Sequence, residues 1–145
     1  MSKTDIAIQK FASGCNCAQS VLSSFGNDLN LNENTALKIA CGFGAGMGRM
    51  QEVCGAVSGG IMVIGMKYGQ ARADDREAKE KTYAMTRELM ERFERKHGSC
   101  RCKALLKGCE LLTEDGQKEF KDNGLHDKVC KECVKSVVEI LEKLV

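Results

Sequence analysis

The sequence predicts an all-α protein with a single domain over residues 1–145, and three observations support this. The chain contains no proline, which favours helices joined by short turns. Apolar residues recur at the spacing of an amphipathic helix, most clearly between Arg72 and His97. Hydrophobic residues make up 43% of the chain but aromatic residues only 5%, so we expect a core of aliphatic, methionine and cysteine side chains. The fold class is therefore a single compact bundle of six or seven helices with a glycine-rich central turn.

Two short helices are expected first, over residues 5–13 and 17–25. Apolar residues recur at helical spacing in both segments. Gly14 is a suitable end for the first helix, and Asn16 is a suitable N-cap for the second. One continuous helix with Cys15 on its buried stripe is the alternative.

The next two helices flank the glycine-rich turn. Asn32 or Asn34 is expected to cap a helix over 33–43, which the glycines of residues 42–48 interrupt. The following helix is expected from about residue 54 to 67 or 68. Its four glycines lower its intrinsic helix propensity but allow another backbone to come close. A strand over residues 61–64 is the alternative in this segment.

Three further helices complete the prediction. The helix over 72–97 is the clearest, and its end is marked by a glycine after His97. Ser99 is expected to cap a helix over 100–112, and Asp127 is expected to cap the last helix. The apolar stripe of the helix over 72–97 consists of Ala78, Thr82, Met85, Leu89 and Phe93.

Charge and hydropathy exclude several classes of partner. The 22 basic and 20 acidic residues leave a net charge of +2, so neither a polybasic nucleic-acid arm nor an acidic tail is present and no nucleic-acid partner is expected. The longest uncharged run, residues 53–66, is too short to span a bilayer. The N-terminus does not have the charged-then-apolar pattern of a secretory signal. We therefore expect a cytoplasmic protein with reduced thiols and no membrane insertion.

The glycine cluster at residues 42–48 does not match a nucleotide-binding motif. Neither pair of closely spaced glycines is followed by a third glycine at the distance of the dinucleotide fingerprint, and no buried strand precedes it. The lysine and hydroxyl residue that end a triphosphate loop are also missing. The cluster is therefore interpreted as a closely packed turn.

The nine cysteines include three short-range motifs. Residues 130–133 form CxxC, and CxC pairs occur at 15–17 and 100–102. Covalent haem attachment needs a histidine after CxxC, where Val134 stands, so no haem is expected. No two CxxC units occur at zinc-ribbon spacing, which disfavours a simple zinc finger. Two cysteines on one helix are also consistent with small buried side chains.

Four cysteines share a position at the start of an expected helix. Helix starts carry partial positive charge and free N–H groups, which lower the pKa of a thiol and stabilise a thiolate or a negatively charged metal–sulfur cluster. This arrangement predicts redox or metal chemistry. The four residues are Cys17 after Asn16, Cys54 at the opening of the fourth helix, Cys102 after Ser99, and Cys130 after Asp127.

The histidines are less informative. His97 is expected at a helix end and His126 just before the last helix, and each lies within four residues of a cysteine, so metal ligation is the alternative to a structural role. No serine–histidine–acid or paired-carboxylate pattern stands out, and whether the protein is an enzyme stays open. Six methionines are expected to pack in the core rather than to bind metal: Met47, Met50, Met62, Met66, Met85 and Met90.

Five sequence blocks around these cysteines resemble those of one protein family. The family is the C-GCAxxG-C-C family of redox-active proteins, and the resemblance covers nearly the whole chain. Its members also resemble the non-haem part of split-Soret cytochromes. The blocks are GCNCAQSVL at 14–22, GFGAGMGR at 42–49, EVCGAVSG at 52–59, CKALL at 102–106 and CKECV at 130–134.

The resemblance implies a small helical redox protein whose family cysteines are Cys17, Cys54, Cys102 and Cys130. The resemblance also implies an iron–sulfur cluster as the cofactor, and no haem. Five cysteines depart from the family pattern, so the choice between Cys100 and Cys102, and between Cys130 and Cys133, stays open. The departures are Cys15, Cys41, Cys100, Cys109 and Cys133.

Three functional hypotheses follow. In the first, the four family cysteines bind an iron–sulfur cluster for electron transfer or redox sensing, and backbone N–H groups near Gly44, Gly46, Gly48 and Gly55 tune its potential. In the second, a pair such as Cys17 and Cys54 carries out metal-free thiol–disulfide exchange. The third is a structural zinc-binding or helical interaction module. A redox partner protein and a homodimer are also expected.

Overall fold

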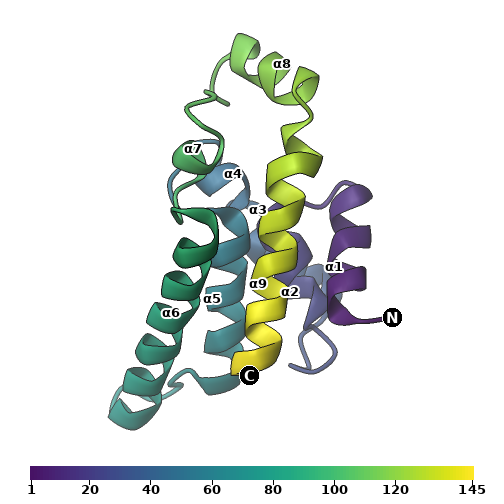
Figure 1. Ribbon diagram of the computed structural model, residues 1–145. Helices are drawn as coiled ribbons and strands as arrows, with labels where there is room; N and C mark the ends of the chain where they lie inside the picture. The colour runs from purple at the N-terminus through teal and green to yellow at the C-terminus, as the bar shows by residue number, and fades with distance from the viewer.

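The computed structural model describes residues 1–145 and consists of helices joined by turns and loops (Figure 1). No strand forms; Val53 and Arg101 make one isolated antiparallel β-bridge. The predicted all-α fold class is therefore confirmed, and the alternative of a strand over 61–64 is wrong because this segment is helical. The elements are α1 (Lys3–Ala12), α2 (Cys17–Ser24), α3 (Glu33–Cys41), α4 (Gly44–Met47), α5 (Gly55–Tyr68), α6 (Arg76–His97), α7 (Cys102–Leu105), α8 (Glu114–Asp122), a π-helical turn η1 (His126–Cys130) and α9 (Lys131–Leu144).

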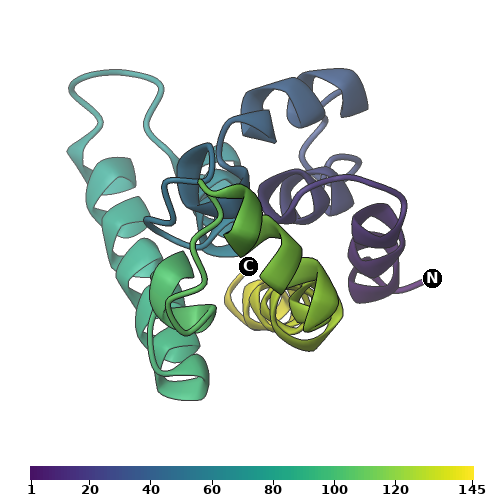
Figure 2. The same ribbon diagram turned by 90° about the horizontal axis from the view of Figure 1, so that it is seen from above.

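Helix α5 is at the centre of the bundle. It packs against α2, α6 and α9, and Figure 1 shows it running between α6 and α9. Seen from above, the short α7–α8 segment extends over one end of this bundle (Figure 2). Helix α5 is apolar on all sides, as expected of a helix that neighbours surround. No helix is both long and apolar enough to cross a membrane.

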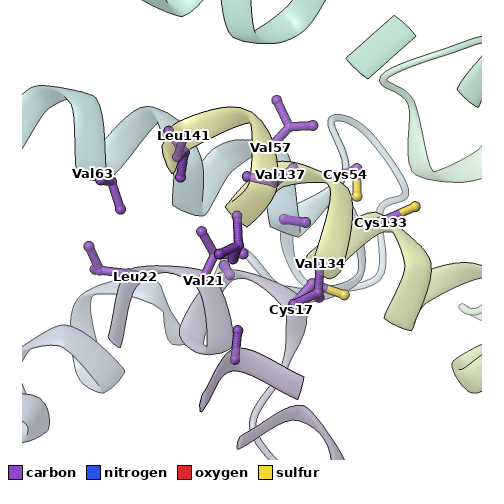
Figure 3. Close-up of a cluster of buried hydrophobic side chains, with 14 of the residues drawn as sticks. Cys17, Val21, Leu22, Cys54, Val57, Val63, Cys133, Val134, Val137 and Leu141 are labelled. Carbon is purple, nitrogen blue, oxygen red and sulfur yellow. The ribbon is translucent and has the colours of Figure 1, made fainter. Parts of the chain in front are cut away.

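The core is mainly aliphatic, as predicted. Figure 3 shows Val21, Val57 and Leu141 among the side chains of one buried cluster, with cysteine side chains at one end of it. Phe93 is the largest fully buried side chain. The expectation that six methionines lie in the core is wrong for three of them, because Met47, Met50 and Met66 are exposed. These three lie in or near turns, where helical spacing does not determine which face is buried.

Local hydrogen bonds explain where the first helices begin. Asn16 Oδ1 accepts a hydrogen bond from Gln19 N at 2.9 Å, and Asn16 N donates to Gln19 Oε1 at 2.9 Å. This reciprocal capping box starts α2 and separates it from α1, so the alternative of one continuous helix is wrong. Asn32, rather than Asn34, caps α3 through Thr35 N. Asp75 caps α6 through Ala78 N, so this helix starts later than predicted.

The predicted helix over 100–112 is wrong. Helix α7 ends after four residues because Lys107 and Gly108 adopt left-handed conformations, with φ of +53° and +85°. Ser99 does not cap it; its Oγ accepts a hydrogen bond from Arg101 N instead. Helix α8, which the prediction missed, is capped by Thr113 and is almost entirely polar, so its apolar periodicity is weak.

The last helix also begins differently from the prediction. Asp127 is not its N-cap, because the π-helical turn η1 already begins at His126 and continues directly into α9. The Asp127 carboxylate lies 3.2 Å from His126 Nδ1 instead. Cys130 therefore lies at the end of η1, inside a continuous helical segment, and not in the first turn of a capped helix.

The predicted glycine-rich turn is present between α3 and α5. It contains five left-handed residues in succession, from Ala45 to Arg49, and Gln51 is also left-handed with φ of +59°. A Cβ on Gly46 would lie 2.6 Å from the Cα of Gln51, so only glycine fits there. This turn brings residues 45–54 against the starts of α2 and α7.

Candidate functional site: a cavity lined by cysteines

One cavity of about 430 Å³ gathers the cysteines that the sequence singled out. It lies where α2 and α5 begin and where α7 and η1 face them. Six of the nine cysteines line it, and we call it the cysteine cavity: Cys15, Cys17, Cys54, Cys102, Cys130 and Cys133. The structure thus brings the four family cysteines together and adds two of the five departures.

Cys17 and Cys54 are adjacent because α5 begins against the start of α2. Cys17 is the first residue of α2, and Cys54 is the N-cap of α5. Between the two helices lies Gly55, whose Cβ, if it had one, would be 2.9 Å from Phe43 O and 3.2 Å from Cys17 Cβ. A side chain at residue 55 would therefore push the two helix starts apart.

The β-bridge places Cys102 beside Cys54. Cys54 N donates to Cys100 O at 2.7 Å, and Cys102 N donates to Glu52 O at 2.7 Å. An ion pair between Glu52 and Arg101 covers the bridge on its outer side. The backbone therefore joins the segment before α5 to the segment before α7.

The sulfurs of Cys17, Cys54 and Cys133 lie at the same end of the core cluster (Figure 3). Cys133 is only 1% exposed and lies in the first turn of α9, three residues after Cys130. Residues three apart share one face of a helix, so both side chains line the cavity. The sequence left open whether Cys130 or Cys133 belongs to the site, and the structure places both in the same wall of the cavity.

Two thiol–thiol contacts define the sulfur arrangement. The Cys133 thiol donates a hydrogen bond to Cys54, and the Cys17 thiol donates one to Cys130. All nine cysteines are free. The pair suggested from the sequence, Cys17 and Cys54, is close enough to interact electrostatically, but no hydrogen bond joins the two thiols.

These contacts shift the thiol pKa values in opposite directions. The hydrogen bond from Cys133 lowers the pKa of Cys54, assisted by the backbone N–H groups of Ala56 and Val57, although burial opposes them. The same hydrogen bond and burial raise the pKa of Cys133. The hydrogen bond to Cys130 and burial likewise raise the pKa of Cys17. Among the cavity thiols with a shifted pKa, Cys54 is thus the one whose ionised form is favoured.

Cys102 has a different environment from the two pairs. Burial and the neighbouring Cys54 and Cys130 raise its pKa to about 12, although a hydrogen bond with Gln51 opposes the shift. Cys102 therefore stays protonated at neutral pH in the metal-free chain.

Three cysteines lie outside the cavity. The Cys100 thiol donates to Met90 O at 3.4 Å, and burial raises its pKa to about 11. The Cys109 thiol donates to Gly116 O at 3.2 Å. Both are held by backbone carbonyls as structural residues. Cys41 is exposed on the surface.

The four glycines expected near a cofactor have different positions. Gly55 lines the cavity. Gly44 and Gly46 are buried behind the wall, and a Cβ on Gly44 would lie 2.4 Å from Asn16 Nδ2. Gly48 is exposed, and a Cβ at this position would have no atom within 4 Å. Close packing accounts for Gly44 and Gly46.

Sequence reasoning missed two polar residues of the site. Gln51 is buried, and its side chain bonds to Cys109 O at 2.7 Å and Leu111 N at 2.8 Å. Arg49 lines the cavity from the glycine-rich turn. No sequence signal predicts either position. Both residues lie in left-handed backbone, and local sequence patterns do not indicate where such backbone occurs. His126, which also lines the cavity, stacks on Phe11 with ring centroids 4.0 Å apart.

The possible metal ligands of the cavity are mainly thiols. The lining contains six thiols and no carboxylate, which is the chemistry of soft metals and iron–sulfur clusters. No three His, Cys, Asp or Glu side chains are close enough together to hold a single metal ion. A compact zinc site of the expected kind would therefore require rearrangement of the thiols.

The comparison with protein families agrees with this site. The family model described as "Putative redox-active protein (C_GCAxxG_C_C)" matches residues 15–144. No curated protein and no solved structure matches the chain. Since the match takes in nearly the whole chain and every cysteine of the cavity, the protein belongs to the C-GCAxxG-C-C family, which is described as redox-active.

Proposed function

We propose that the protein carries out thiol–disulfide exchange in the cysteine cavity, with Cys54 and Cys133 as the reacting pair. The observation that carries this proposal is that the Cys133 thiol lies beside Cys54 at the start of α5, in the same cavity. The N–H groups of a 14-residue helix face the Cys54 sulfur and stabilise its thiolate. A second thiol already within contact distance is what an intramolecular disulfide requires.

The exchange proceeds in two steps. The Cys54 thiolate attacks one sulfur of a partner disulfide, forms a mixed disulfide and releases the other half as a thiolate. Cys133 then loses its proton to solvent and attacks Cys54, which forms the Cys54–Cys133 disulfide and releases the second half as a thiolate. The partner disulfide gains two electrons, and the two cysteines lose them. The partner can be a redox protein or a small molecule.

Mild oxidation with a disulfide is expected to link Cys54 to Cys133 first. The reduced protein would be treated with limiting oxidant, its free thiols blocked, and its disulfides located by peptide mapping. Cys133→Ser is expected to accumulate the mixed disulfide on Cys54, because the resolving thiol is absent, and Cys54→Ser to form neither product. Cys41→Ser, which removes an exposed thiol outside the cavity, serves as the matched control. A first disulfide between any other pair of cysteines would refute the proposal.

A second candidate function is iron–sulfur cluster binding for electron transfer or redox sensing. The specific observation behind it is that Cys17, Cys54, Cys102 and Cys130 come from four separate segments and reach one cavity without a carboxylate in its wall. When bound, a cluster would supply one-electron chemistry through its iron atoms. The N–H groups at the start of α5 would offset the negative charge of its sulfurs.

Anaerobic reconstitution with ferrous iron and sulfide is expected to give a coloured protein if this second function operates. Iron and acid-labile sulfide would be counted, and the visible spectrum recorded. Serine variants of each of the four cysteines are expected to lose most of the iron, whereas Cys41→Ser keeps it. A colourless, iron-free protein with native helicity would count against cluster binding. It would leave the dithiol proposal intact, since that requires no metal.

We also propose a cytoplasmic location, where reducing conditions would keep the nine free thiols reduced. A redox partner protein would meet the mouth of the cavity, where the half-buried Cys15 and Cys130 lie. The homodimer and the zinc-binding module stay predictions, because no observation in the structure favours either.

A further inference from the structure

The cysteine cavity is larger than a reacting pair of thiols needs. Its volume of about 430 Å³ is within the range of pockets that bind small organic molecules. Part of the wall is apolar, formed by Leu105, Leu106, Leu111, Phe120 and Val129. The flat stack of His126 on Phe11 forms a further part of the lining. The space therefore suits a molecule with an apolar or aromatic body.

The permanent charge in the cavity lining is positive. Arg49 is the only permanently charged residue in the lining, and no aspartate or glutamate lines it. Every ion pair of the chain is formed by other residues, and no side-chain hydrogen bond involves Arg49. Its guanidinium group therefore keeps its full capacity to bind an anion, and a carboxylate is the partner that its fork geometry fits best.

The position of Arg49 follows from the strained turn. With φ of +69°, Arg49 is the last residue of the left-handed run that begins at Ala45. This conformation is unfavourable for arginine and is maintained by the packing of the turn, whose backbone bonds Gln51 N to Ala45 O and Glu52 N to Gly46 O. The backbone of the turn therefore fixes the position of Arg49 in the cavity lining.

We propose that the cysteine cavity binds small disulfides that carry an anionic group, with Arg49 holding the anion while Cys54 attacks the disulfide. This inference rests on the proposed function and adds the substrate class to it. One equivalent of substrate disulfide is reduced to two thiols as Cys54 and Cys133 form their disulfide, so electrons and protons balance as in the two steps above. Cationic disulfides of similar size are disfavoured, because no acidic group in the lining binds them.

Three probe disulfides of different charge test the inference. They are 5,5′-dithiobis(2-nitrobenzoate), which is anionic, 4,4′-dithiodipyridine, which is neutral, and cystamine, which is cationic. The rate of Cys54–Cys133 disulfide formation would be measured with each at low salt. Arg49→Ala is expected to slow the reaction of the anionic probe about tenfold, the effect of losing one charge-assisted contact, and to leave the neutral probe unchanged. Arg49→Lys should retain most of the rate, and Arg49→Glu should reverse the charge preference.

The matched control is Arg95→Ala, which removes an exposed arginine in the last turn of α6. It is expected to leave all three rates unchanged. If every Arg49 variant forms the disulfide with unchanged relative rates for the three probes, the inference is overturned but the dithiol proposal stands. If none of the probes links Cys54 to Cys133 in the wild-type protein, the proposed function itself fails.

Discussion

Replacement of Gln51 by alanine is expected to lower the free energy of unfolding by about 2–6 kcal/mol. The Gln51 side chain is buried, donates to Cys109 O at 2.7 Å and accepts from Leu111 N at 2.8 Å. Alanine would leave both backbone groups without a partner, and each unpaired buried group costs about 1–3 kcal/mol. Urea denaturation followed by circular dichroism would measure the loss.

The same substitution should also change the site. Gln51 contacts Cys102, and the Cys109–Leu111 segment that it holds leads from α7 to α8. Loss of this tie is expected to increase alkylation of Cys102 and hydrogen exchange at Leu111. Gln70→Ala is the control, because Gln70 donates only to carbonyls of an exposed turn. Equal stability of the two variants would show that Gln51 does not hold the segment.

Replacement of Gly59 by alanine is expected to destabilise the protein by about 2 kcal/mol, through overpacking between α2 and α5. An added Cβ would lie 2.7 Å from Ala18 O and 3.1 Å from Val21 Cβ. The first neighbour is backbone, so it can move only if α2 shifts as a whole. The shift would also displace Cys17, which begins α2, away from the start of α5.

Gly65→Ala on the same helix is the matched control, with the opposite expected sign. No atom lies within 4 Å of a Cβ built on Gly65. Alanine there should raise the free energy of unfolding by about 0.5–1 kcal/mol, because it has the higher helix propensity. The urea midpoints of both variants test the argument together. A Gly59→Ala protein as stable as Gly65→Ala would contradict the close contact between α2 and α5.

Local sequence signals predicted most of the helices. The capping box of Asn16 and Gln19 depends on residues three apart, so the start of α2 and the position of Cys17 were predictable. The amphipathic pattern predicted α6 within a few residues of its start. The segment after Ser99 was mispredicted because left-handed Lys107 ends α7 without a sequence signal, and polar α8 has little apolar periodicity.

By itself, the sequence determined the fold class, the aliphatic core and the presence of several cysteines near helix starts, because capping and hydrophobic periodicity act over three or four residues. Only the tertiary structure decided that Cys133 faces Cys54, that Cys17 faces Cys130 and that Arg49 lines the same cavity. These contacts join segments far apart in the chain. They depend on how α5 and α9 are rotated and on the left-handed turn before α5, which local pattern does not specify.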